Sequence, residues 1–137
     1  MSAGTGNIVW AIAKAHRLDQ LRYCHANEIN EPLAGKLAAA FPDVEVHAED
    51  FLTCNGNLGT FDRIVMNPPF TQGADIQHIL RARAMLNPGG KLVALCANGP
   101  RQQEQLKPFA ETWEILPEGS FQEAGTNVRV ALLTIRG

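Results

Sequence analysis

The pattern of hydrophobic and polar positions alternates between helical and extended spacing along the chain. Apolar residues recur three or four positions apart in three segments, which predicts helices over 7–17, 30–41 and 74–86. A shorter polar helix is expected over 101–109. Extended or alternating patterns predict strands over 22–28, 44–48, 61–66, 91–97, 112–116 and 128–136. Helices that alternate with strands and end in a β-rich tail predict an α/β fold, a mostly parallel sheet with an antiparallel C-terminal strand and helices on both faces.

Two of these helices have a defined apolar face. The first carries Pro32 in its first turn and is expected to bury Leu33, Leu37 and Ala40. The second is expected to bury Ile76, Ile79, Leu80, Ala84 and Leu86. In that helix, Asp75 and His78 are interpreted as a pair on the solvent side rather than as metal ligands. Glycine-rich and Asn-rich turns are expected at 55–59 and 87–90.

Composition indicates one globular domain over residues 1–137. The chain is 45% hydrophobic and 19% charged, and its net charge of -2 gives no broad basic field for nucleic acid. Its longest apolar run, 92–97, is far too short for a membrane span, and no signal peptide is recognisable. The three cysteines make neither a disulfide framework nor a metal pair, so we expect a cytoplasmic protein without bound metal.

Two weak motifs lie where α/β sheets bind ligands, at the ends of predicted strands. The segment Ser2-Ala3-Gly4-Thr5-Gly6 leads into the first helix, and its glycines allow a ligand to approach the backbone. Glu28 and Asp50 follow two strands, and Phe51 stands beside the second acid. A carboxylate there can accept hydrogen bonds from a ribose diol. Taken singly, each feature also fits an ordinary terminus or a solvated turn.

The sharpest motif is Asn67-Pro68-Pro69-Phe70, directly after the strand over 61–66. Two prolines cannot continue a sheet ladder, and they fix the direction of the local carbonyl groups. The Asn67 side chain and a neighbouring carbonyl can accept the two protons of a planar amine, and Phe70 offers a ring for stacking a base. The alternative is a rigid turn, which would need no particular residue on either side of the prolines.

In order and spacing, these motifs resemble the Rossmann-like S-adenosylmethionine-dependent amino-methyltransferases of DNA, of the adenine-specific, phage or mobile-element type. Asn-Pro-Pro-Phe matches that family's (Asp/Asn/Ser)-Pro-Pro-(Tyr/Phe) signature, and the segments 86–91 and 120–128 match its later turn and its target-base pocket border. The resemblance implies S-adenosyl-L-methionine as cofactor and direct methyl transfer to an exocyclic amine. It implies catalytic roles for Asn67, Pro68 and Phe70, and substrate contacts by Pro69, Phe121 and Thr126. The cofactor contacts that it implies are Ser2, Gly4, Gly6, Glu28, Asp50, Phe51 and Asn67.

Two departures from that family shape the expected partners. In that family the first central strand precedes the segment that begins at Ser2. Three outcomes are therefore expected as alternatives: the two strands beside the missing one pair directly, a strand is exchanged in a homodimer, or the chain is a truncated inactive module. No segment is long enough for a target-recognition domain, so DNA targeting is expected to come from outside the chain. A protein-glutamine methyltransferase and an RNA-base methyltransferase remain as alternatives.

Overall fold

The computed structural model describes residues 25–27, 31–41, 45–47, 51–52, 59–117 and 129–137. The chain forms two compact units, Met1–Gly59 and Thr60–Gly137, which are described separately. The predicted helix over 7–17 lies outside the described residues.

In the first unit, two short parallel strands are connected by a helix. β1 (His25–Asn27) pairs with β2 (Glu45–His47), and α2 (Glu31–Ala40) lies between them in sequence. Both strands fall within the predicted segments, and Pro32 occupies the first turn of α2 as expected, where its missing N–H costs nothing. The predicted strand–helix–strand order of this part is confirmed.

The buried face of α2 differs from the predicted one. Leu37 is buried as expected, but Leu33 is only half-buried and Ala40 is exposed. The buried positions are instead Ala34, Leu37 and Phe41, which follow the i, i+3, i+7 spacing of one helix face. Burying the large Phe41 ring removes more apolar surface from water than burying the Ala40 methyl group, which explains the rotated face.

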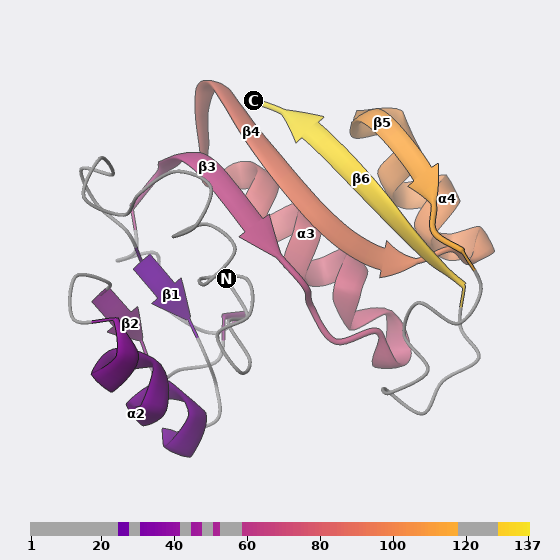
Figure 1. The fold of residues 1–137 in the computed structure, drawn as a ribbon. Coiled ribbons are helices and arrows are strands. Elements are labelled where there is room, and N and C mark those ends of the chain that lie inside the picture. Colours follow the sequence, from indigo (N-terminus) through magenta and orange to yellow (C-terminus); the bar gives the residue numbers. More distant parts are fainter. Residues whose placement is uncertain (1–24, 28–30, 42–44, 48–50, 53–58, 118–128) are drawn as a thin grey trace. The chain divides into compact units, whose positions relative to one another are not determined.

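The second unit is built on a four-stranded sheet in the order β3-β4-β6-β5 (Figure 1). Its strands are β3 (Phe61–Met66), β4 (Leu86–Ala97), β5 (Ala110–Ile115) and β6 (Val130–Arg136). β3 and β4 are parallel, whereas β6 runs antiparallel to both of its neighbours, β4 and β5. A mostly parallel sheet with one antiparallel C-terminal strand was the predicted topology, and it is confirmed.

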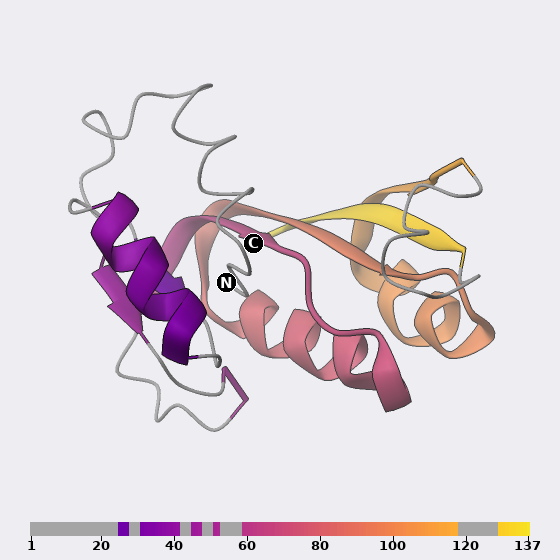
Figure 2. The same cartoon turned by 60° about the horizontal axis from the view of Figure 1, so that its bottom comes forward.

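The helices of this unit lie on one face of the sheet, as Figure 2 shows. η2 (Thr71–Gly73) and α3 (Ala74–Ala84) connect β3 to β4, and α4 (Pro100–Leu106) with η3 (Lys107–Phe109) connects β4 to β5. None of the helices in the described residues is long and apolar enough to cross a membrane.

Alternate residues of the strands form the core under these helices. Register pairs place Leu92 opposite Ile135, and Ala94 opposite Leu133, on the same face of the sheet. All four residues are buried. From the helix side, Ile76, Ile79 and Ala82 of α3 and Leu106 of α4 complete the core.

The junction of α3 and β4 corrects two predictions. α3 ends at Ala84, which is exposed, and Leu86 already belongs to β4, where it pairs with Phe61. The expected turn over 87–90 lies inside the same strand. Its backbone is nevertheless irregular, because Gly89 has a φ of +78°. A Cβ on Gly90 would lie 2.9 Å from the Asn87 carbonyl oxygen, so only glycine allows this close approach.

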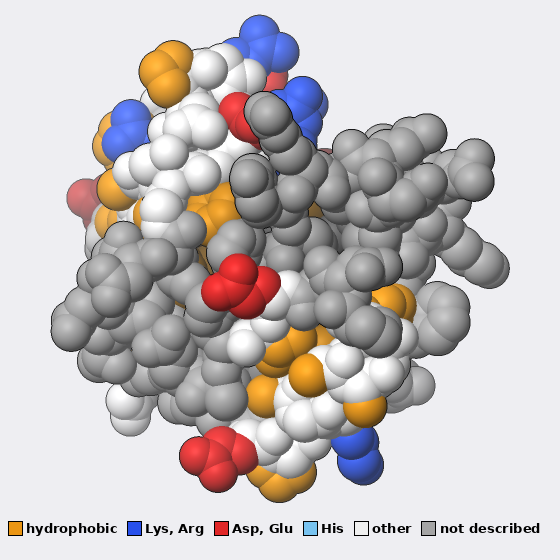
Figure 3. All heavy atoms as spheres, turned by 90° about the vertical axis from the view of Figure 1, so that its left-hand side faces the viewer, with side chains coloured by type: hydrophobic (Ala, Val, Ile, Leu, Met, Phe, Trp, Pro, Cys, Tyr) orange, Lys and Arg blue, Asp and Glu red, His pale blue; other side chains and the backbone are white. Residues whose placement is uncertain are grey.

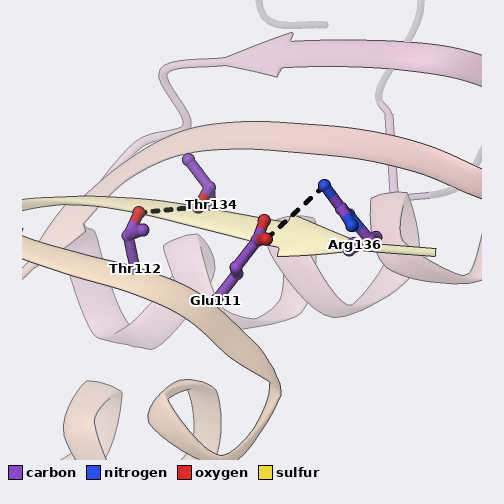
Figure 4. A network of polar contacts seen from close by, with 4 residues as sticks. All are labelled: Glu111, Thr112, Thr134 and Arg136. Carbon is purple, nitrogen blue, oxygen red and sulfur yellow. Dashed lines mark hydrogen bonds and ion pairs between the residues drawn. The ribbon is translucent and has the colours of Figure 1, made fainter.

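Polar pairs bridge β5 and β6 on the other face of the sheet (Figure 4). The hydroxyl oxygens of Thr112 and Thr134 lie 2.6 Å apart, and Arg136 lies 3.6 Å from Glu111. The ion pair is exposed, so its expected contribution to stability is about 0–1 kcal/mol. The apolar face under the helices therefore dominates the stability of this unit.

Leu133→Ala tests that core. Leu133 is fully buried in β6, so its truncation should lower the free energy of unfolding by about 2–5 kcal/mol, through lost burial and a residual cavity. The neighbouring Leu132→Ala, at a half-buried position on the opposite face, is the matched control and should cost clearly less. Urea unfolding followed by circular dichroism measures both, and equal losses would contradict the assignment of the core.

Candidate functional site

The Asn67–Phe70 segment leaves the sheet at the carboxyl end of β3. Asn67 is exposed, Pro68 is buried, Pro69 is exposed and Phe70 is half-buried. A buried proline with a fixed φ anchors the segment, while the Asn67 amide remains accessible from solvent. The segment therefore carries an exposed polar side chain next to a buried proline.

A left-handed turn follows this segment and leads into α3. Gln72 has a φ of +55° and Gly73 a φ of +72°, and Gln72 is the one non-glycine residue with positive φ in the described part of the chain. Left-handed backbone costs a residue with a side chain about 1–2 kcal/mol. The Arg101 guanidinium packs against Gly73, where an added Cβ would lie 3.4 Å from its Nη1 atom. Strain next to a proposed site is a common feature of functional loops.

Asp75, in the first turn of α3, is fully buried. Its Oδ1 atom accepts a hydrogen bond from the Ile76 backbone N–H at 2.9 Å, and its Oδ2 atom accepts one from the Ala97 N–H at 2.9 Å. The Gln102 Nε2 atom lies 3.3 Å from both carboxylate oxygens. One carboxylate thus joins the start of α3, the end of β4 and helix α4.

This arrangement corrects the interpretation of Asp75 and His78 as a surface pair, because both side chains are buried. A buried carboxylate is costly unless donors compensate it, and hydrogen bonds to charged groups contribute about 1.5–3 kcal/mol each. The described donors to Asp75 provide this compensation. In the described residues, no three His, Cys, Asp or Glu side chains gather closely enough to hold a metal ion.

The carboxyl end of β4 carries a second polar junction. The Asn98 Oδ1 atom accepts hydrogen bonds from Gln103 Nε2 at 3.1 Å and from Trp113 Nε1 at 3.3 Å. The Asn98 N–H donates to the Arg129 carbonyl oxygen at 2.8 Å. Asn98 therefore connects α4 and β5 to the backbone just before β6, at the sheet edge where parallel strands usually present ligand-binding loops.

Cys96 lies in β4, one residue before the Ala97 N–H that Asp75 binds. Burial raises the pKa of the Cys96 thiol from 9.0 to about 12, and the negative charge of Asp75 adds to the rise. The thiolate is the reactive form, so this cysteine is a core residue and not a nucleophile.

The structure places the predicted site residues unevenly. Asn67, Pro68, Pro69 and Phe70 lie together in the second unit. The remaining predicted contacts, apart from Phe51, fall outside the described residues: Ser2, Gly4, Gly6, Glu28, Asp50, Phe121 and Thr126. Phe51 belongs to the first unit and is 5% exposed, so its side chain is buried. Its predicted contact with an adenine stays a prediction.

Sequence reasoning missed Asp75, Gln102 and Asn98. One signal was available for Asp75, since it is an acid in the first turn of a helix that directly follows the Asn-Pro-Pro-Phe motif, where helix N–H groups lack helical acceptors. Gln102 and Asn98 carried no such signal. Their contacts depend on how α4 folds back on β4, which spacing alone does not reveal.

Gly73→Ala tests the turn after the motif. An alanine would adopt a left-handed conformation against Arg101, so we expect a loss of about 1–2 kcal/mol in the free energy of unfolding. Gly35→Ala is the matched control, because Gly35 lies in α2 with open space around it, and alanine there should stabilise the helix by about 0.5–1 kcal/mol. Thermal unfolding of both variants checks the opposite signs, and a stabilising Gly73→Ala would contradict the described turn.

The state of Cys96 gives a second test. At pH 8 its raised pKa lowers the thiolate population roughly a thousandfold relative to an ordinary cysteine, and its side chain is buried. Iodoacetamide should therefore leave Cys96 unmodified in the folded chain and label it once urea unfolds the protein. Peptide mapping by mass spectrometry separates it from the other two cysteines, and fast labelling of native Cys96 would contradict its placement.

Comparison with curated proteins gives one named relative. The chain is 30% identical over 94 residues to EEF1A lysine methyltransferase 2 of Danio rerio, a match that covers 61% of this chain and 40% of the relative. The chain thus spans about two fifths of the length of the curated relative it matches.

Solved structures match the fold of nearly the whole chain. TrmN from Thermus thermophilus superposes with a TM-score of 0.76 at 18% identity, covering 98% of this chain and 41% of TrmN. The 23S rRNA methyltransferase ErmE gives a TM-score of 0.65 at 18% identity, covering 98% of this chain and 58% of ErmE. Another matched methyltransferase was solved with S-adenosyl-L-homocysteine bound. At these identities the likeness establishes the Rossmann-like methyltransferase fold.

A family model matches most of the chain, including the motif at the end of β3. The family model described as "Methyltransferase small domain" matches residues 1–121, a stretch that includes the Asn67–Phe70 segment, the left-handed turn and Asp75. The prediction of a methyltransferase is confirmed: the chain belongs to the methyltransferase small domain family.

Proposed function

We propose that this chain forms the catalytic core of an S-adenosyl-L-methionine-dependent methyltransferase that acts on an exocyclic amine of a nucleic-acid base, with adenine in DNA as the favoured target. One observation carries the proposal. At the carboxyl end of β3 the exposed Asn67 is followed by the buried Pro68 and, three positions along the chain, by the half-buried Phe70. A planar amine and the aromatic base that bears it need this pairing of acceptor and ring.

The roles of these residues follow from the chemistry of the amine. The Asn67 side-chain oxygen and the Pro68 carbonyl accept the two amine protons, which draws the nitrogen lone pair out of conjugation. Phe70 stacks on the base and, with Pro69, limits its orientation. S-adenosyl-L-methionine supplies a methyl group that is already activated by its positively charged sulfur. The protein's contribution is therefore mainly to position the reactants and shape the electrostatics. A base in a duplex must leave the stack first, at a cost of a few kcal/mol.

The cofactor assignment is supported by family membership and by a matched methyltransferase that holds the demethylated form of this cofactor. Within this chain the proposed contacts are the glycine segment at Ser2, Gly4 and Gly6, the acids Glu28 and Asp50 with Phe51, and the Asn67 backbone.

The proposed partner is nucleic acid, with targeting supplied by a further domain or protein. In the view of Figure 3 the coloured residues show basic and acidic side chains in small separate groups, without one large basic patch. A net charge of -2 agrees with this view. Pairing with a second copy, with exchange of a strand, stays part of the proposal, as does a cytoplasmic location.

Protein methylation is the second candidate, and the curated relative favours it. EEF1A lysine methyltransferase 2 is named for a side-chain amine, which is also a nitrogen acceptor of a methyl group. RNA is a third substrate class, because one matched structure is an rRNA methyltransferase. Phe70 favours a base over a lysine side chain, since an aliphatic amine offers no ring for stacking.

Radiolabelled methyl transfer separates these substrate classes. The purified chain is incubated with methyl-labelled S-adenosyl-L-methionine and with unmethylated DNA, RNA and protein pools. We expect label in DNA, within adenine. Label confined to protein would overturn the nucleic-acid proposal, and a folded chain that fails to bind S-adenosyl-L-methionine in calorimetry would overturn the proposed enzyme.

Asn67→Ala tests the proposed amine acceptor. Losing one positioned hydrogen-bonding group at a reacting centre typically costs 100-fold or more, so kcat should fall by roughly that factor. Affinity for S-adenosyl-L-homocysteine, measured by calorimetry, should change little because only the Asn67 backbone is assigned to the cofactor. Asn67→Asp is the matched control, since it keeps an acceptor oxygen and should retain more activity. Equal loss of catalysis and cofactor affinity in Asn67→Ala would contradict the assignment.

A further inference from the structure

We propose that Asp75 is a positioning residue of the amine site, which holds the Asn67–Gly73 segment in place by tying the start of α3 to the carboxyl end of β4. Asp75 does not itself touch the substrate in this proposal. The inference rests on the proposed function, because it assigns Asp75 a task within that same site. It goes further by naming what keeps the site in its working conformation.

The Asn67–Gly73 segment is fixed on both of its sides to one strand, β4. At its start, Met66 pairs with Ala94 in the parallel register of β3 and β4. At its end, Asp75 Oδ2 accepts the Ala97 N–H of β4 at 2.9 Å. Eight residues, 67–74, therefore run between two anchors, Met66 and Asp75, whose partners lie three residues apart on β4. Loosening either anchor would release the segment that carries Asn67.

The surroundings of Asp75 require a carboxylate at this position. Within the described residues, the hydrogen-bond partners of Asp75 are the Ile76 and Ala97 N–H groups and the Gln102 side-chain amide, and all of them donate. A carboxylate accepts only, so it suits every one of these donors. An asparagine has the same shape but carries an NH₂ group, which would meet donors instead of acceptors in a fully buried place.

Helix α4 also holds the Asp75 carboxylate, through Gln102. Gly99 precedes α4, and a Cβ there would lie 2.7 Å from the Gln102 Oε1 atom. The absence of a side chain at Gly99 thus leaves room for the Gln102 amide, whose nitrogen lies 3.3 Å from both oxygens of Asp75. Asp75 is held by three different parts of the second unit, as a fixed anchor should be.

Asp75→Asn is the principal test. Misplacing a reacting group by a small distance can cost about 100-fold in rate, so we expect kcat to fall 10- to 100-fold. Affinity for S-adenosyl-L-homocysteine should stay within threefold, because the other proposed cofactor contacts lie in residues 2–51. Ile135→Val is the control for general destabilisation, since it removes one buried methyl group from β6 and should leave kcat within twofold.

A compensating change separates positioning from folding. Adding Gln102→Glu to Asp75→Asn gives the new NH₂ group an acceptor at position 102 and leaves the amide oxygen to accept the Ala97 N–H, the contact with β4. The double variant should therefore recover at least fivefold of the lost kcat. Gln102→Glu alone places two carboxylates together and should be impaired. If Asp75→Asn does not fold, Gly99→Ala provides the test, because it displaces the Gln102 amide and should give a smaller loss of kcat.

Hydrogen exchange gives a readout that does not depend on activity. In Asp75→Asn, the amides of Thr71, Gln72, Gly73 and Ala97 should exchange at least tenfold faster, whereas Ile135→Val should leave their relative protection unchanged. Unchanged exchange at these amides, or an unchanged kcat, would overturn the role of Asp75. A wild-type chain that binds S-adenosyl-L-methionine but methylates no DNA, RNA or protein would instead overturn the proposed function, and the exchange data would still decide whether Asp75 holds the segment.

Discussion

A buried carboxylate connects the loop that follows β3 to the strand beside it. Asp75 brings together the first turn of α3, the last residue of β4 and the amide of Gln102 in α4. Removing a charge from water is expensive, so such a group persists only where donors surround it. The same hydrogen bonds that offset this cost determine where the Asn67–Phe70 segment lies, and in this way the core of the second unit and its candidate site depend on one side chain.

The other features of the site restrict the backbone of the Asn67–Gly73 segment. Pro68 is buried, Gln72 and Gly73 are held in left-handed conformations, and Arg101 packs over Gly73. Each of these restricts the backbone near Asn67. For a reaction in which the methyl group arrives already activated, geometry is the main contribution that a protein can make. An exposed Asn67 on this restricted backbone, three residues before Phe70, agrees with that requirement.

Much of the fold could be predicted from the sequence because its strands and helices differ strongly in pattern. The strand over 61–66 was predicted residue for residue, and the antiparallel ending of the sheet followed from the β-rich tail. Finer features were missed where tertiary packing decides. Burial of Phe41 places the buried side of α2 at other residues than the spacing predicts. Leu86 lies in β4 and not in α3, because it pairs with Phe61. The Asn67–Phe70 segment is recognisable in the sequence because two adjacent prolines end a strand. The pattern predicts Asp75 on the surface, since an acid in a helix usually faces water, and the structure buries it.

The position of the transferred methyl group is the most direct test of the central claim, that the Asn67–Phe70 segment holds an amine. Nucleoside mass spectrometry, with nuclear magnetic resonance of the product, identifies the atom that carries the label. We expect methylation of an exocyclic nitrogen, which is N6 if the base is adenine. A methyl group on a ring carbon or on a ribose oxygen would contradict it.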